Sequence, residues 1–213
     1  TITRADFKDF NSHILEDNNS LQAIEWIPKV PIGLKENYET RARNDGLTNF
    51  HLKEKNNGEM IDVVDRPVYY PVYFIEPLEG NEKALGFDLS SDLIRYEALK
   101  KSVSTNEPVA TEGIDLVQEQ KSQKGILIFD PVKKNNRLIG FSLGVYRVGD
   151  LISNALSNLD EEMFNISVFD ISSETGEQLL AKRSTRDLNS VLEELHLDAV
   201  DGLHYKQNVQ IAD

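Results

Sequence analysis

The residues of this chain best suited to chemistry are polar side chains that lie among aromatic ones and could line a small-molecule pocket. The stretch YYPVYFIEPLEGNEKALGFDLSSD, residues 69–92, is rich in aromatic residues, breaks at Pro77 and Gly80, and restarts as short helices. Tyr73 joins a hydroxyl to a flat apolar ring, which suits a ligand site and also a packed core. The residues that could close the rim of such a pocket are Asp88 and Thr111.

Two strands further along the chain could supply the walls of the same pocket. The segments 124–132 and 137–148 read as strands, and the turn between them contains Asn135 and Asn136, which tolerate the positive φ of a hairpin. One face of the second strand is apolar and bulky and the other is small, so either a helix packs close to the small face or a ligand lies there. The wall residues would be Leu127 and Phe129, and the floor residues would be Ser142, Gly144 and Tyr146.

The sequence lacks the familiar patterns of catalytic and metal sites. Its four histidines are far apart and lack zinc-site spacing, and no phosphate-binding glycine motif or nucleophile elbow occurs. The absence of Cys excludes disulfides and thiol catalysis. The segment DISSETGE, residues 170–177, lacks the acidic positions of a calcium loop and is interpreted as a hairpin turn. We therefore expect no catalytic residues, no metal and no cofactor, and we do not expect this chain to be an enzyme.

Charge and hydropathy limit the partners that the chain can have. Its 213 residues include 23 Lys and Arg against 36 Asp and Glu, a formal net charge of −13, so phosphate backbones and anionic lipid surfaces would repel it. No run approaches the roughly 20 apolar residues of a membrane helix. We expect no nucleic acid partner, and contact with a membrane only through segments outside this fragment of a longer protein.

The N-terminal region is predicted to be a helix. Phe7, Phe10, Ile14, Leu21 and Ile24 follow a heptad spacing, and Pro28 ends the helix at the latest. Such a helix could pack on its own domain or pair with a second subunit, and three heptads are too few to choose between them.

The rest of the chain is predicted to mix helices with antiparallel strands. The pattern indicates helices at 34–47, 81–87, 91–105 and 148–159, strands at 61–65 and 67–76, an extended segment at 108–118, a hairpin at 164–183 turning at Thr175 and Gly176, a helix at 187–195 and a strand at 203–211.

Four stretches, taken in order, resemble the CHASE domain, a sensor module of membrane receptors. AIEWIPKVP followed by ENYE looks like the opening motif, and YYPVYFIEPLEGNEKALGFDL is similar to the most characteristic block of the family. NEPVATEGIDLVQE and GILIFDPV, followed by LIGFSLGVYRVGDLI, complete the match over roughly residues 20–155. Each piece is weak alone, and the order of all four makes the resemblance specific.

The resemblance implies an α+β fold in which a long N-terminal helix precedes two PAS-like antiparallel-sheet subdomains. The implied division is an N-terminal helical stalk at 1–48, a membrane-distal ligand-binding subdomain at 49–150 and a membrane-proximal subdomain at 151–213. It also implies a periplasmic or extracellular position between two transmembrane helices of an inner-membrane protein. The cytoplasmic output of such receptors is usually a histidine kinase, a nucleotide cyclase or a diguanylate cyclase.

Two departures from the plant members of the family bear on the ligand. Those members bind the adenine-derived hormone cytokinin, using an acidic residue where this chain has Arg95 and a Thr where it has Phe129. Both differences remove polar partners for adenine, so we predict that cytokinin does not bind. Arg95 carries a planar cationic fork, which would suit an anionic ligand or would pair with a carboxylate of the chain such as Asp92.

The sequence therefore predicts an extracytoplasmic sensor domain of a histidine kinase or diguanylate cyclase receptor that binds a small, anionic or amphipathic molecule. Homodimerisation through the N-terminal helix is expected. The alternative is a module that recognises a periplasmic protein partner without a small ligand.

Overall fold

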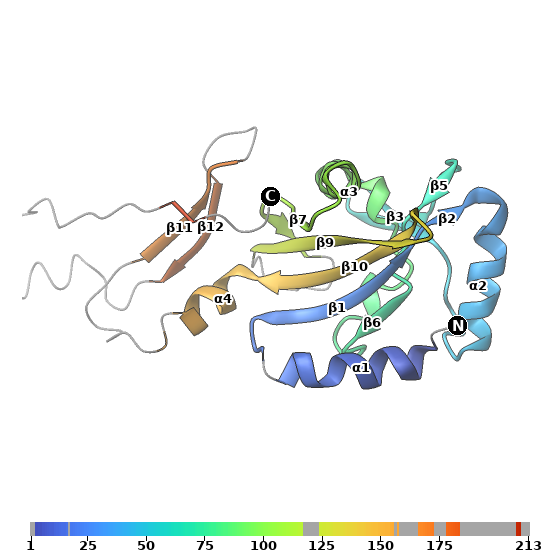
Figure 1. Ribbon diagram of the computed structural model, residues 1–213, viewed down its shortest axis with the longest axis horizontal. Helices are drawn as coiled ribbons and strands as arrows, with labels where there is room; N and C mark the ends of the chain where they lie inside the picture. The colour runs from blue at the N-terminus through green and yellow to red at the C-terminus, as the bar shows by residue number, and fades with distance from the viewer. Residues whose placement is uncertain are drawn as a thin grey trace, which may run out of the picture.

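A computed structural model describes residues 3–16, 18–116, 124–155, 157, 166–172, 178–183 and 208–209. Its main body is a six-stranded antiparallel sheet with strand order β6–β1–β10–β9–β7, and β8 pairs with the free end of β9 (Figure 1). The strands are β1 (Leu21–Pro28), β6 (Phe74–Glu76), β7 (Val109–Ala110), β8 (Ile114–Asp115), β9 (Lys124–Lys134) and β10 (Arg137–Arg147). The mixture of helices and an antiparallel sheet confirms the α+β class.

The two longest strands form the hairpin that the sequence predicts. β9 and β10 pair along almost their full lengths, from Arg137 opposite Lys134 to Arg147 opposite Gly125. Asn135 and Asn136 in the turn have φ values of 51° and 60°, which this type of turn requires and which Asn tolerates. The helix α4 (Val148–Ala155) follows without a loop, as predicted, and the remainder of the predicted helix 148–159 lies mostly outside the described residues.

The N-terminal prediction is wrong in one important respect, because the helix does not reach Ile24. The helix α1 (Arg4–Glu16) begins at a capping box in which Thr3 and Asp6 exchange hydrogen bonds, and Leu21 and Ile24 lie in β1. β1 is an inner strand between β6 and β10, although it falls within the region 1–48 that the sequence assigned to a helical stalk. Leu21 and Ile24 continue the heptad spacing of α1 only by coincidence, because β1 is an inner strand whose two faces are both covered.

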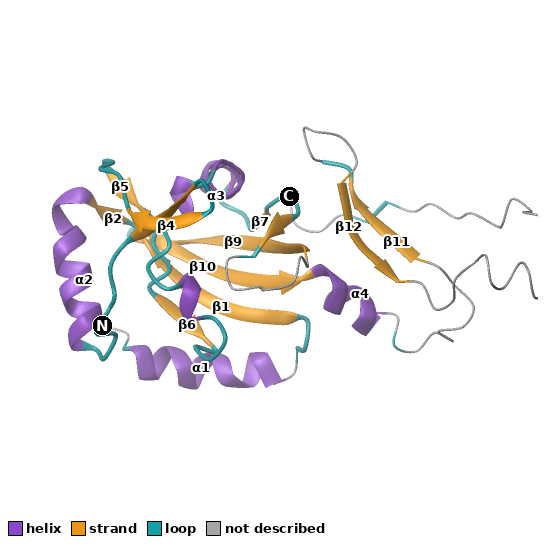
Figure 2. Ribbon diagram, turned by 180° about the vertical axis from the view of Figure 1, so that it is seen from behind, coloured by secondary structure: helices purple, strands orange, loops and turns teal. Residues whose placement is uncertain are grey.

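Helices cover both faces of this sheet (Figure 2). α3 (Leu93–Thr105) lies against β9 and β7, whereas α1 lies against β1 and β6 on the other face. The first face carries the larger core, which includes Ala23, Ile27, Phe129, Phe141 and Leu143. The second face carries a smaller core around Tyr73 and Phe74, to which α2 (Lys35–Asn44) adds Ala42 and Tyr38.

The aromatic stretch is less regular than its sequence suggests. The predicted strand 67–76 is broken into β5 (Val68–Tyr69) and β6, and the predicted strand at 61–65 is β4 (Glu59–Asp62), which pairs with β3 (Lys53–Asn56). β2 (Val30–Pro31) pairs with β5 and leads into the 3-10 helix η1 (Ile32–Leu34). The predicted helix at 81–87 is reduced to η2 (Glu82–Ala84), and η3 (Leu89–Ser91) precedes α3.

A second small hairpin follows α4. β11 (Ile166–Asp170) pairs with β12 (Gln178–Arg183), as the sequence predicts. Three predictions lie outside the described residues: the turn at Thr175 and Gly176, the helix at 187–195, and all but two residues of the strand at 203–211. This hairpin contacts the main body through Asp170, whose carboxylate accepts a 3.1 Å hydrogen bond from the backbone N–H of Gly113. The proposed division into distal and proximal subdomains stays a prediction.

Candidate functional site

The face of the sheet beneath α3 is the best candidate for a binding site, because buried polar groups lie there within an apolar core. α3 begins at Asp92, whose carboxylate accepts a 3.0 Å hydrogen bond from the backbone N–H of Arg95, and it ends at Asn106 in a left-handed conformation. Its buried residues are Arg95, Ala98, Leu99 and Ser102. The predicted wall residues Leu127 and Phe129 belong to the core on this face.

Arg95 lies in the first turn of α3 and is only 6% exposed. One terminal guanidinium nitrogen lies 3.0 Å from the Asp92 carboxylate, and the other donates a 3.1 Å hydrogen bond to the backbone carbonyl of Asp115. The guanidinium also lies over the ring of Phe87, 5.6 Å from its centre. The structure therefore contains the Asp92 pair that the sequence offered as one role for Arg95.

Glu25 is the least compensated titratable group on this face. It alternates along β1 with Ala23 and Ile27, and it lies opposite Leu143 of β10 and Ile75 of β6, all of which belong to the core beneath α3. The residue is 2% exposed, and its carboxylate makes no hydrogen bond or ion pair with any described residue. Burial raises the pKa of the Glu25 carboxyl to about 8, although the Arg95 charge acts in the opposite direction.

A second acceptor on β1 also lacks a donor. The side-chain amide nitrogen of the buried Gln22 donates a 3.1 Å hydrogen bond to Asn81, and Asn81 in turn donates to the carbonyl of Pro77. The amide oxygen of Gln22 is buried and has no hydrogen-bond partner among the described residues. Such groups are rare in folded proteins, because a buried acceptor without a donor forfeits its interaction with water.

Sequence reasoning missed Glu25 and Gln22 because the segment was assigned to a helix. The signal that could have found Glu25 is its position in AIEWIP, where it is the one acidic residue of an otherwise apolar run. Interpreted as a strand, this run would have placed Glu25 on the same face as Ala23 and Ile27.

Thr111 joins this face at its edge. Its backbone N–H donates to the Leu127 carbonyl at 2.9 Å, and its hydroxyl accepts a 3.0 Å hydrogen bond from the Leu127 backbone N–H. Both interactions fix the chain beside β9, and they leave Thr111 buried at the end of β7.

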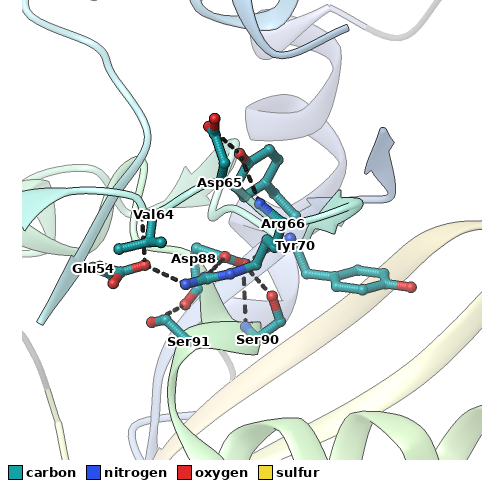
Figure 3. A network of polar contacts seen from close by, with 9 residues as sticks. Glu54, Val64, Asp65, Arg66, Tyr70, Asp88, Ser90 and Ser91 are labelled. Atoms are coloured by element: carbon teal, nitrogen blue, oxygen red, sulfur yellow. Dashed lines mark hydrogen bonds and ion pairs between the residues drawn. The ribbon is translucent and has the colours of Figure 1, made fainter. Parts of the chain in front are cut away.

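Asp88 is fully buried and forms part of a polar network between the 3-10 helix η3 and the loop before β5 (Figure 3). Arg66 donates to the carboxylates of both Asp88 and Glu54. Asp88 also accepts hydrogen bonds from the backbone of Tyr70 at 2.8 Å and from both the backbone and the hydroxyl of Ser90. Burial disfavours the Arg66 charge, but the two carboxylates outweigh this effect and raise its pKa.

Tyr73 lies on the opposite side of the sheet from α3. Its ring packs against Tyr38, Phe50 and Phe74 with centre-to-centre distances of 5.0–5.6 Å, and its hydroxyl donates to the Tyr38 carbonyl at 3.4 Å. It belongs to the smaller core, so the structure places it with packing residues.

The predicted floor residues Ser142, Gly144 and Tyr146 also face away from α3. They pair with Asp130, Ile128 and Ile126, while the intervening residues of β10 point into the α3 core. Ser142 is exposed, and a Cβ on Gly144 would lie 2.9 Å from the Tyr146 ring. Tyr146 therefore covers part of the face of β10 that carries Ser142 and Gly144.

Eight of the nine predicted site residues thus fall on two faces of one sheet, and Asp88 lies in the network with Arg66, so no single small ligand could contact all of them. Arg95, Thr111, Leu127 and Phe129 gather on the α3 side, to which the structure adds Glu25.

An open groove of about 540 Å³ lies at the end of the sheet farthest from α4. Lys29 and Arg137 line it beside apolar side chains, and neither cation forms an ion pair within the part of the chain that the structure describes. The complete lining is Lys29, Pro31, Leu34, Tyr38, Arg137, Leu138 and Ile139.

The described residues contain neither a metal-binding group of side chains nor a membrane span. In this part of the chain, no three His, Asp or Glu side chains are placed to hold a metal ion. No described helix has the length and hydropathy of a membrane span.

Comparison with known proteins agrees with the resemblance noted in the sequence. The chain is 24% identical over 195 residues to hybrid signal transduction histidine kinase A of Dictyostelium discoideum, covering 82% of this chain and 9% of that kinase. It is also similar to a crystal structure of the extracellular domain of a proposed histidine kinase, mmHK1S-Z2, with 14% identity, a TM-score of 0.38, and coverage of 78% of this chain and 53% of the other. The model of the CHASE domain matches residues 1–181, so the chain belongs to the CHASE domain family of extracellular sensor domains.

Proposed function

We propose that this chain is the extracytoplasmic ligand-sensing domain of a transmembrane receptor of the histidine kinase type, and that a small molecule binds between α3 and the sheet. The observation that carries the proposal is the pair of buried polar side chains, Glu25 and Arg95, within an otherwise apolar core. Ligand sites combine these features, because apolar walls exclude water and a few polar groups orient the ligand. A diguanylate cyclase output is the alternative that the sequence raised.

The fold offers a direct path from this face towards the rest of the receptor. β10 continues into α4, which contacts both β9 and β12, and Asp170 of β11 binds the backbone of Gly113. A ligand that favours one position of α3 would thereby bias β7, β9 and the second hairpin. It can shift this equilibrium only by the difference between its affinities for the two arrangements.

Homodimerisation is part of this proposal. Phe7 of α1 packs on Phe74, with ring centres 5.6 Å apart, whereas Phe10 and Ile14 of the predicted seam are 75% and 44% exposed. An exposed pair of large apolar residues on a helix is suited to a second copy of the same helix. Sedimentation of the chain over a range of concentrations tests this, and a monomer at every concentration would contradict it.

The ligand-sensing proposal is tested by a thermal-shift screen of the purified chain with amines, amino acids, carboxylates, adenine derivatives and phosphorylated metabolites. A ligand present at 100 times its dissociation constant adds about 2.7 kcal/mol to the free energy of unfolding. Replacing the buried Ala98 with Leu should abolish the shift, because the larger side chain would occupy the position proposed for the ligand between α3 and the sheet. The exposed Lys101→Leu change on the same helix is its matched control. Binding that survives Ala98→Leu would place the ligand elsewhere.

A second candidate function rests on the groove at the far end of the sheet. Its two cations, which form no ion pair with any described residue, and its apolar lining fit an acidic amphipathic segment of a partner protein. Cross-linking from this groove to an extracytoplasmic protein, lost in Arg137→Glu, would support it. A small-molecule shift lost in Ala98→Leu would favour the first candidate.

A further inference from the structure

We propose that the ligand of this site carries a protonated amine or a similar cationic N–H donor, and that Glu25 binds it. This inference rests on the proposed ligand-sensing function and names the chemical class of its ligand. The inference rests on the position of Glu25. This residue is 2% exposed, it lies on the covered face of the inner strand β1, and no described residue donates a hydrogen bond to its carboxylate.

No described residue around Glu25 explains its burial structurally. Its strand neighbours across the sheet are Leu143 and Ile75, which are apolar. Arg95 is the charged residue that acts on it, but both ends of that guanidinium are already bound by Asp92 and by the Asp115 carbonyl. A buried carboxylate without partners costs several kcal/mol, so its presence in a core is a pointer to function.

A cationic ligand has the opposite charge to the anionic ligand that the sequence predicted from Arg95. An anion bound on this face would compete with Asp92 for Arg95. A cationic ligand would gain a partner in Glu25 and would leave the Arg95–Asp92 pair intact. The structure therefore favours the cation.

Protonation gives this proposal a distinctive signature. Because burial holds a proton on Glu25 at neutral pH, a cation that binds there displaces one proton to solvent. Its strand neighbours, Leu143 of β10 and Ile75 of β6, do not titrate, and Arg95 of α3 is the charged residue that acts on it. The affinity for an amine should therefore rise about tenfold per pH unit between pH 6 and 7.

The test uses calorimetry and thermal shift on the 213-residue chain with cyclohexylamine, 2-phenylethylamine and putrescine, each beside its neutral alcohol, and with succinate and phenylacetate as anions. We expect at least one amine to bind and its alcohol not to bind. Glu25→Gln should weaken amine binding at least tenfold and abolish the proton release. Glu76→Gln, which removes the same charge from the neighbouring strand on the other face, should change neither.

The outcomes separate this inference from the function on which it rests. Equal binding of an amine and its alcohol, or amine binding unchanged in Glu25→Gln, would overturn it. If a carboxylate bound and no amine did, the sensor function would stand and the proposal of a cationic ligand would be overturned. If no compound of any class shifted the melting temperature, both would be overturned.

Discussion

Two sets of buried carboxylates in this domain differ in whether the described residues supply them with partners. Asp88 and Glu54 share the guanidinium of Arg66, and Asp88 also accepts hydrogen bonds from Tyr70 and Ser90 (Figure 3). Glu25 is buried as deeply, about the middle of β1, and no described residue donates to it. The first set is a structural network, in which each negative charge has partners within the chain.

The comparison suggests how to find a site in a sensor domain that is otherwise well packed. Burial alone does not mark function, because Asp88 is fully buried and its partners account for it. The informative feature is burial without compensation, since folding gains nothing from leaving a carboxylate dry and unpaired. On that criterion Glu25 differs from Asp88, although both are acidic residues in the interior.

The largest expected effect comes from breaking the compensated network. Arg66→Ala should lower the free energy of unfolding by about 3–5 kcal/mol, because it leaves the buried Asp88 and Glu54 without their cation. Urea denaturation monitored by circular dichroism measures this. Lys100→Ala breaks an exposed pair with Glu97 and should cost less than about 1 kcal/mol. Equal effects of the two changes would remove the contrast between a compensated and an ordinary ion pair.

A smaller effect should appear in the pH dependence of stability. The folded chain holds the Glu25 proton up to a pKa of about 8, whereas the unfolded chain releases it near the ordinary glutamate pKa of 4.5. The folded state therefore binds more protons between these values, so stability falls as pH rises through this window. From pH 6 to pH 8 this group alone should cost about 2 kcal/mol.

Glu25→Gln removes this titration, so the variant should be more stable than the parent chain at pH 8 and should show a flatter profile. Denaturant titrations of both proteins at pH 6, 7 and 8 measure the difference. Parallel profiles would show that Glu25 is ionised and compensated, which would place it in the same class as Asp88.

The smallest effect should come from Asp92→Ala. It removes the N-terminal cap of α3 and one partner of Arg95, for a loss of about 1–2 kcal/mol in the free energy of unfolding. It also frees the Arg95 guanidinium to act on Glu25, so the pKa of Glu25 should fall and the pH dependence should become weaker. A steeper pH profile in this variant would contradict the assignment of Arg95 as a cation occupied by Asp92.

Local sequence was sufficient where neighbouring residues decide the structure. The β9–β10 hairpin follows from two alternating runs and an Asn-Asn turn, and α3 begins at Asp92, whose side chain caps it. The Arg95–Asp92 pair was also accessible, because residues three apart on a helix are neighbours. The family itself was visible in four ordered motifs.

Residues 21–24 show where local reasoning fails. Leu21 and Ile24 continue the spacing of Phe7 and Ile14, yet they lie in a strand whose pairing partners are more than 100 residues away in β10 and about 50 residues away in β6. An inner strand is apolar on both faces and therefore loses the alternation that would have identified it.

Sequence alone thus determined the family, the α+β class, the long hairpin and the start of α3, because short-range periodicity, turn chemistry and capping fix these features. Tertiary structure alone decided which side of the sheet each side chain faces. It separated Tyr73, Ser142, Gly144 and Tyr146 from Arg95 and Phe129, and it placed Glu25 among apolar residues beneath α3. Burial and compensation of a charge depend on contacts between distant segments, and no local pattern records them.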